Sequence, residues 1–196
     1  LSEMRSIAGV NAILLMTQLG NLGGDALLDV LTGKVNPSGK TTDTWAENYM
    51  DYPSSAKFSH NESVHDEMYE DGIYVGYRYF DSFGVKPLYC FGYGKSYTDF
   101  EIKAGKISVE GNEIQIPVTV KNTGNCTGTE TLQLYIHDIA ASVVRPVREL
   151  KDFKKVTLRP GEEKKVVFTI TEQQLLFLTE NGIYESEAGE FEIFIG

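Results

Sequence analysis

The sequence predicts a mainly β protein, in which a β-sandwich of the immunoglobulin or fibronectin type III kind follows a truncated α/β segment and an aromatic-rich linker. Three observations lead to this fold class. Short runs of alternating apolar and polar residues fill the C-terminal half of the 196-residue chain. The N-terminal part has a helix, strand, helix pattern instead. The interval between the two is rich in aromatic residues and turn signals.

The N-terminal segment has the pattern of one αβα step of a parallel sheet. Leu1, Met4 and Ala8 share a possible helical face, and the apolar run VNAILLM is typical of a strand that is buried on both faces. The segment DALLDVLTG follows a Gly-rich turn, with Asp25 as its expected N-cap and Gly33 as its expected C′ residue. Because one strand cannot form a sheet, we expect this segment to complete a domain whose other strands lie outside the chain.

Aromatic residues crowd into the stretch YEDGIYVGYRYFDSF, residues 69–83, which makes disorder a poor interpretation. Aromatic faces can stack on sugar rings, but the alternation from Ile73 onward also fits a strand that packs on both faces. We favour packing between neighbouring domains, with Arg78 paired to an acid such as Asp71 or Asp81. The residues expected at this packing surface are Tyr74, Tyr77, Arg78 and Tyr79.

The sandwich is expected from residue 99 onward, because runs of period two alternate there with turns such as NTGNCTG, LRPGEE and TENG. In each run the apolar side chains share one face, as the inner face of a sandwich requires. About seven short strands fit into this length, the number typical of immunoglobulin and fibronectin type III folds. The expected inward residues are Ile114, Ile116, Val118 and Val120, then Leu132, Leu134 and Ile136, then Val166, Phe168 and Ile170, and finally Phe191, Ile193 and Ile195.

Composition and charge exclude several classes of partner. A net charge of −10 argues against nucleic acid and anionic membranes, since phosphate binding needs clustered Lys and Arg. No run of the sequence approaches the roughly 18 apolar residues that span a bilayer. Cys90 and Cys126 suggest no disulfide framework, so a reducing cytoplasm is the expected location, with secretion as the alternative left open.

Three blocks of the sequence resemble glycoside hydrolase family 3, the β-glucosidases and their relatives. The first two are GNLGGDALLDVLTGKVNPSGKTTDTW and YEDGIYVGYRYFDSFGVKPLYCFGYGKSYTDF, and the third contains VTVKNTGNCTGTETLQLYI, RPVRELKDFKKVTLRPGE and AGEFEIFIG. Together they cover nearly the whole chain in the order of the family. Thr41 and Thr42 depart from the family's frequent Leu-Pro, and Cys90 and Lys95 from its Pro and Leu, which puts details of the linker's packing in doubt.

The resemblance implies a (β/α)8 barrel, an α/β sandwich domain and a fibronectin type III-like domain. Residues 1–40 would then be the C-terminal end of the α/β sandwich domain, residues 41–98 an interdomain linker that packs on its neighbours, and residues 99–196 the fibronectin type III-like domain. The first two blocks look closer to bacterial members in which the domain order is permuted.

The resemblance also implies where the chemistry lies. An Asp nucleophile would come from the barrel and, in many members, a Glu acid/base from the α/β domain upstream of Leu1. Both catalytic carboxylates would then lie outside this chain, which would be inactive alone. The implied partners are the remaining barrel and α/β domains and a small β-glucoside, with no metal or organic cofactor, because paired carboxylates suffice.

The turn QLGNLGGD joins the end of the predicted buried strand to a helix, at the place where α/β sheets form ligand crevices. Gln18, Asn21 and Asp25 are therefore candidates for the rim of the substrate site. The alternative is that the glycines of this turn only permit a tight bend and close packing of the helix.

The run NESVHDEMYED is strongly acidic, but its spacing matches neither an EF-hand nor a zinc site, so a solvated loop is the favoured interpretation. His60, His65 and His137 have no metal-ligand spacing either. The sequence therefore predicts no metal site and no catalytic residue. The acids of this run are Glu62, Asp66, Glu67, Glu70 and Asp71.

Functions of different classes fit these observations. In the first, the chain is the non-catalytic C-terminal portion of an exo-acting, retaining β-glucosidase-like enzyme that hydrolyses terminal β-linked glucose or a related sugar. In the second, it is an independent β-sandwich module that binds carbohydrate or protein. In the third, its role is purely structural, with the sandwich supporting the α/β domain against the barrel.

Overall fold

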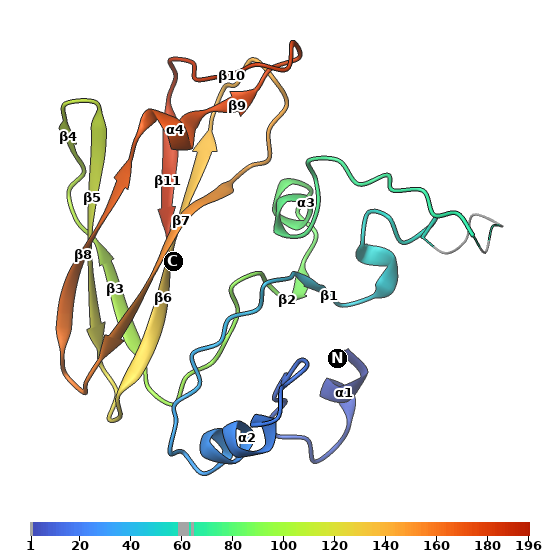
Figure 1. Cartoon of the computed structure of the whole chain (residues 1–196), viewed down its shortest axis with the longest axis vertical. Coiled ribbons are helices and arrows are strands. Elements are labelled where there is room, and N and C mark those ends of the chain that lie inside the picture. The colour runs from blue at the N-terminus through green and yellow to red at the C-terminus, as the bar shows by residue number, and fades with distance from the viewer. Residues whose placement is uncertain (1, 59–62, 64) are drawn as a thin grey trace. The chain divides into compact units, whose positions relative to one another are not determined.

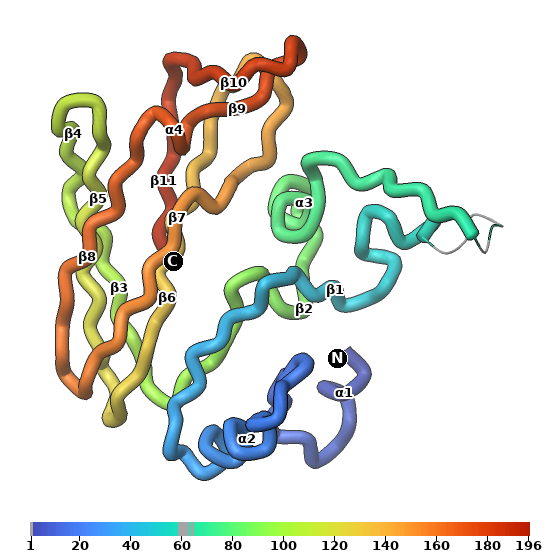
Figure 2. The backbone as a smooth tube through the Cα atoms, viewed as in Figure 1, coloured from blue at the N-terminus to red at the C-terminus, as the bar shows by residue number. Residues whose placement is uncertain are grey.

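The computed structural model describes residues 2–58, 63 and 65–196. The chain forms two compact units, Leu1–Gly94 and Lys95–Gly196 (Figure 1). The backbone trace shows mostly irregular chain in the first unit and long paired strands in the second (Figure 2). No helix in the described part of the chain is long and apolar enough to cross a membrane.

The second unit is a sandwich of two antiparallel sheets. One sheet has the order β11 (Phe191–Ile195), β6 (Gly128–Asp138), β7 (Glu149–Leu158). In the other, β3 (Phe100–Ala104) and β4 (Ser108–Glu110) pair in succession with β5 (Glu113–Asn122), and β8 (Glu163–Ile170) also pairs with β5. A helical turn, α4 (Glu172–Leu175), and the short pair β9 (Phe177–Leu178) and β10 (Tyr184–Glu185) complete the unit. The mainly β sandwich that the sequence predicts is confirmed.

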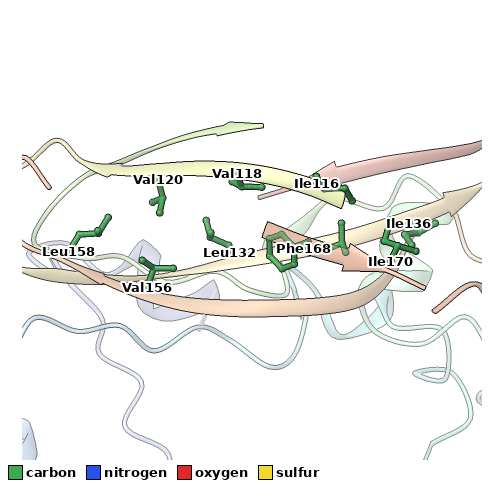
Figure 3. Packing of buried hydrophobic residues seen from close by; sticks show 10 residues of the cluster. Ile116, Val118, Val120, Leu132, Ile136, Val156, Leu158, Phe168 and Ile170 are labelled. Atoms are coloured by element: carbon green, nitrogen blue, oxygen red, sulfur yellow. The ribbon is translucent and has the colours of Figure 1, made fainter. Parts of the chain in front are cut away.

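The core lies between the two sheets and consists of the inward-facing residues of successive strands (Figure 3). In β5, Ile116, Val118 and Val120 are at most 1% exposed, whereas the residues between them are half-buried. Burial of each such side chain stabilises the fold by roughly 1.5–3 kcal/mol. All four predicted inward faces pack in or against this core, and those of β11 are partly buried at the sheet edge.

The first unit begins with two helices, α1 (Ser2–Ser6) and α2 (Gly23–Leu31). Gly33 follows α2 with φ of +74°, the left-handed conformation expected of a glycine at C′. The N-cap prediction is wrong, because the N-cap is Leu22, and Asp25 lies in the first turn, where its charge complements the helix dipole. Leu1, expected on a helical face, lies outside the described residues.

The strand expected in VNAILLM does not form, since residues 10–16 belong to no sheet among the described residues. A strand exists only where a neighbour exchanges backbone hydrogen bonds with it, so an apolar run alone cannot produce one. Leu14 and Leu15 remain 45% and 49% exposed, and Leu28 and Leu31 of α2 remain 58% and 66% exposed. Such an apolar surface fits burial against further elements of an α/β domain.

The rest of the first unit contains short elements. They are β1 (Trp45–Ala46), the 3-10 turn η1 (Tyr49–Asp51), α3 (Tyr77–Ser82) and β2 (Pro87–Tyr89), and β1 pairs with β2 in an antiparallel ladder. Thr41 forms two backbone hydrogen bonds of 2.8 Å in the same unit. Its N–H donates to the Tyr93 carbonyl, and its own carbonyl accepts from the Gly92 N–H.

The possible strand from Ile73 to Phe80 is wrong, because this stretch turns into the helix α3. Gly76 precedes the helix with φ of +55°, a conformation that ends any extended run. The Phe80 N–H then donates to the Gly76 carbonyl at 3.2 Å, which sets the helical period. Phe80 is 1% exposed and its ring lies edge-on to Tyr52, with centroids 5.9 Å apart.

Candidate functional site

The turn before α2 carries the predicted rim residues. The Gly23 N–H closes this turn by donating to the Gly20 carbonyl at 2.9 Å. Thr17 precedes the turn with φ of +50°, a left-handed conformation that is unfavourable for a β-branched residue. The rim residues, all of them exposed, are Gln18, Asn21 and Asp25.

The glycines of this turn do not have one common explanation. A Cβ on Gly23 would lie 2.4 Å from the Cβ of Leu19, so close packing alone accounts for this glycine. A Cβ on Gly20 or Gly24 would meet no atom within 4 Å. Packing inside this chain therefore explains one glycine of the turn, and the rim role of the neighbouring polar residues stays a prediction.

The four residues predicted to pack between domains lie on α3 or just before it, and all are half-buried. Tyr74 and Tyr79 share one partner, Phe83, with ring centroids 5.0 Å apart in each pair. Tyr77 lies against Phe91, also at 5.0 Å. Aromatic pairs contribute about 0.5–1.5 kcal/mol each beyond the area that they bury. The tyrosines thus stabilise their own unit, and the packing of these four residues, Arg78 among them, on neighbouring domains stays a prediction.

The acidic run forms local contacts. Lys57 pairs with Glu70 at 2.8 Å, and the Ser63 hydroxyl donates to Asp66 at 3.1 Å, with both pairs on exposed chain. The part of the chain that the structure describes holds no group of three His, Cys, Asp or Glu residues that could bind a metal. Glu62 and His60 lie outside the described residues.

A buried ionic network in the sandwich escaped the sequence reasoning. Arg145 donates to Asp138 at 3.0 Å and to Glu149 at 2.5 Å, and its guanidinium lies 5.4 Å from the ring centroid of Phe177. The side chain of Asp138 is 3% exposed and that of Arg145 10%. The network joins the end of β6 to the start of β7. Its only sequence signal is an arginine with an acid seven residues before it and another four residues after it.

Glu101, Lys103 and Glu162 have shifted pKa values and lie on the surface of the sandwich. A hydrogen bond from Lys103 lowers the pKa of Glu101, and the same contact raises the pKa of Lys103. The backbone N–H of Arg159 lowers the pKa of Glu162, to which it donates at 2.8 Å. Both shifts of β3 come from one contact within that strand, and the shift of Glu162 comes from a contact within the turn before β8.

Each unit of the chain contains a segment that matches a known protein family. Residues 2–77 match the glycosyl hydrolase family 3 C-terminal domain, and residues 130–196 match the fibronectin type III-like domain. The β-glucosidase BoGH3A of Bacteroides ovatus is 43% identical over 98% of this chain and 27% of its own length. Thermostable β-glucosidase B of Acetivibrio thermocellus is 43% identical over 99% of this chain and 26% of its own length.

A solved structure is similar in the same way. β-Glucosidase 3B of Thermotoga neapolitana, in complex with glucose, superposes with a TM-score of 0.85 at 41% identity, over 95% of this chain and 26% of that one. The chain thus spans about a quarter of the length of the relatives that it matches. Nearly the entire chain is similar to one part of these β-glucosidases, and this similarity does not favour an independent binding module.

Proposed function

The chain belongs to glycoside hydrolase family 3, and we propose that it serves an exo-acting, retaining β-glucosidase-like enzyme as its non-catalytic C-terminal portion. The substrate of that enzyme is terminal β-linked glucose or a related sugar. The observation that carries this proposal is the identity of 43% with a β-glucosidase over 98% of the chain.

The catalytic carboxylates of this enzyme lie outside the chain. Retaining hydrolysis needs two carboxyl groups about 5–5.5 Å apart, one that attacks the anomeric carbon and one that protonates the leaving oxygen. The barrel of the family supplies the first of them, and a barrel takes about 250 residues, more than this chain holds. The role of this chain is therefore to build the surroundings of a site that other domains complete.

The turn before α2 borders the substrate site in this proposal. Its polar side chains, Gln18, Asn21 and Asp25, are exposed and stand next to Thr17, whose strained backbone fits a functional loop. They would hydrogen-bond sugar hydroxyls or position the loop that carries the acid/base.

The half-buried aromatic segment at α3 packs on the domains that it connects. Its tyrosines each lie against an aromatic ring of their own unit and remain only half-buried, which leaves part of their surface for a neighbouring domain. Hydrogen exchange checks this role: the amides of residues 77–82 should exchange more slowly in a longer enzyme than in this chain. Equal exchange rates in both proteins would rule it out.

The experiment that tests the proposed function starts from the gene that encodes this chain. Its full product should contain a barrel and should release glucose from a β-glucoside. Replacement of the barrel Asp by Asn should abolish turnover and leave the circular dichroism spectrum unchanged. A gene product without a barrel, or one that releases no sugar, would overturn the proposal.

A further inference from the structure

The hairpin of β9 and β10 lies at one end of the sandwich and closes through a short turn (Figure 1). The Gly182 N–H donates to the Thr179 carbonyl at 2.9 Å, and the Thr179 N–H donates to the Ile183 carbonyl at the same distance. Gly182 has φ of +75°, which fits the three-residue hairpin turn in which a left-handed glycine follows a type I turn. The residue that precedes this glycine is Asn181.

Asn181 combines an accessible side chain with an unshielded neighbour. It is exposed, and its side-chain amide forms no hydrogen bond with any residue that the structure describes. Of the asparagines in the sequence, only this one precedes a glycine. A Cβ on Gly182 would meet no atom within 4 Å, so solvent surrounds the peptide bond between the two residues. Because glycine has no side chain, nothing shields its backbone nitrogen from the amide of Asn181.

We propose that Asn181 is a site of spontaneous covalent modification, at which its amide converts into aspartate and isoaspartate. The backbone nitrogen of Gly182 loses its proton to solvent and attacks Cγ of Asn181. A bond forms between these two atoms, the bond from Cγ to Nδ2 breaks, and Nδ2 leaves as ammonia with a proton taken from solvent. The attack is intramolecular, so no catalyst needs to bring the groups together.

Water completes the reaction by opening the cyclic imide. Attack of water on Cγ gives aspartate, whereas attack on the backbone carbonyl carbon of Asn181 gives isoaspartate, in which Gly182 is linked through Cγ. The net change is the consumption of a water molecule and the release of an ammonia molecule, with no oxidation or reduction. The only co-reactant is therefore the solvent.

The folded turn slows this reaction and does not prevent it. The Gly182 nitrogen reaches Cγ of Asn181 in the right orientation only after its hydrogen bond to Thr179 opens. This opening has a low cost, because β9 and β10 are two residues long each and bury little apolar surface. The apolar side chains of the hairpin that remain 53% to 68% exposed are Leu178, Ile183 and Tyr184.

Both products change the hairpin. Aspartate adds a negative charge beside Glu180. Isoaspartate lengthens the backbone by a methylene group, so the bonds that join Thr179 to Gly182 and to Ile183 cannot all keep their geometry. The modification therefore loosens the pairing of β9 with β10 as the protein ages.

Peptide mapping by mass spectrometry tests the proposal on the folded 196-residue chain, incubated at mildly alkaline pH. Asn112 is the matched control in the same sample, because it is also exposed in a turn but is followed by Glu113. The peptide with Asn181 should gain the mass of deamidation at least about tenfold faster, because the side chain of Glu113 hinders ring closure at the control. Labelling with a protein isoaspartate methyltransferase should identify isoaspartate in that peptide.

Gly182→Ala separates ring closure from opening of the hairpin. A Cβ at the left-handed φ of this position strains the turn and favours its opening, which alone would speed the reaction. The variant should nevertheless react at least about tenfold more slowly than the native chain, because the new side chain hinders attack by its own nitrogen.

Three results would overturn the proposal. The first is an equal rate of modification at Asn181 and Asn112, and the second is a Gly182→Ala variant that reacts as fast as the native chain. The third is a folded chain that stays unmodified while a synthetic peptide of residues 176–186 is converted, since the turn would then protect the site.

Discussion

The Thr98 hydroxyl donates a hydrogen bond of 2.7 Å to the side-chain carbonyl of Asn122, at a point where the two residues are 6% and 0% exposed. The amide of Asn122 donates in turn to the carbonyls of Cys126 and Leu158, at 2.8 and 3.0 Å. One side chain therefore joins the end of β5, the turn after it and the end of β7. A buried amide with all of its partners present specifies the arrangement of these segments, because no apolar residue can reproduce those bonds.

Replacement of Asn122 by Ala should lower the free energy of unfolding by about 2–4 kcal/mol, since it removes the buried hydrogen bonds to Thr98, Cys126 and Leu158. Urea denaturation followed by fluorescence measures this change. The matched control, Asn125→Ala in the exposed part of the same turn, should change stability by less than about 0.5 kcal/mol. Equal losses in both variants would refute the role given to Asn122.

Arg145→Met should destabilise the sandwich by about 3 kcal/mol, because it leaves the buried carboxylate of Asp138 without its cation. The control removes an exposed pair: Lys103→Met breaks the contact of 2.8 Å with Glu101, whose side chain is 47% exposed, and should change stability far less, because water screens the pair. Thermal unfolding of both variants gives the comparison. A smaller loss for Arg145→Met than for Lys103→Met would contradict the assignment.

The pH dependence of stability should include a contribution from Glu162. The Arg159 N–H holds the pKa of this carboxyl below its ordinary value of 4.5 in the folded chain. A depressed folded pKa means that the stabilisation is complete above 4.5 and is lost as the pH falls through the lower, folded value. Glu162→Gln should therefore be less stable than the native chain at neutral pH, and the difference should shrink in acid.

Denaturation curves recorded along a pH series measure this difference. Glu110→Gln, at an exposed position of β4, is the matched control and should change stability at neutral pH less than Glu162→Gln does. A difference for Glu162→Gln that grows as the pH falls would have the wrong sign for this account.

The rim residues make a kinetic prediction for the longer enzyme. Gln18→Ala and Asn21→Ala should raise KM for a β-glucoside by about threefold to tenfold, the effect of one lost hydrogen bond to the sugar. Glu3→Gln, exposed on α1, should leave KM unchanged. If neither rim variant differs from this control, the turn does not border the substrate.

The sandwich could be predicted from the sequence because its two sheets face each other across one core. Each strand then alternates with period two, as in Ile116, Val118 and Val120, and the pattern survives without knowledge of the partner strand. The least regular strand is β7, where the register with β6 shifts between Leu134 and Tyr135. Its sequence does not alternate cleanly, so the period of two alone does not predict this strand.

The failures have physical causes of a different kind. The run around Leu14 is as apolar as a buried strand, but a strand is defined by its hydrogen-bonded neighbour, which no local pattern reveals. In the aromatic stretch, the left-handed Gly76 changed the period from two to that of a helix. The Arg145 network and the Asn122 contacts join residues that are distant in sequence or belong to common residue types, so no sequence pattern predicts them. The rim and packing roles depend on other domains and stay predictions.

The most direct test of the central claim is a hydrolysis assay on the purified 196-residue chain, with p-nitrophenyl β-glucoside as substrate. We predict no release of p-nitrophenol above the buffer blank, because the proposed function places the nucleophile and the acid/base in other parts of the enzyme. Turnover by this chain, retained after purification and lost on unfolding, would contradict the claim that it is the non-catalytic portion of a β-glucosidase-like hydrolase.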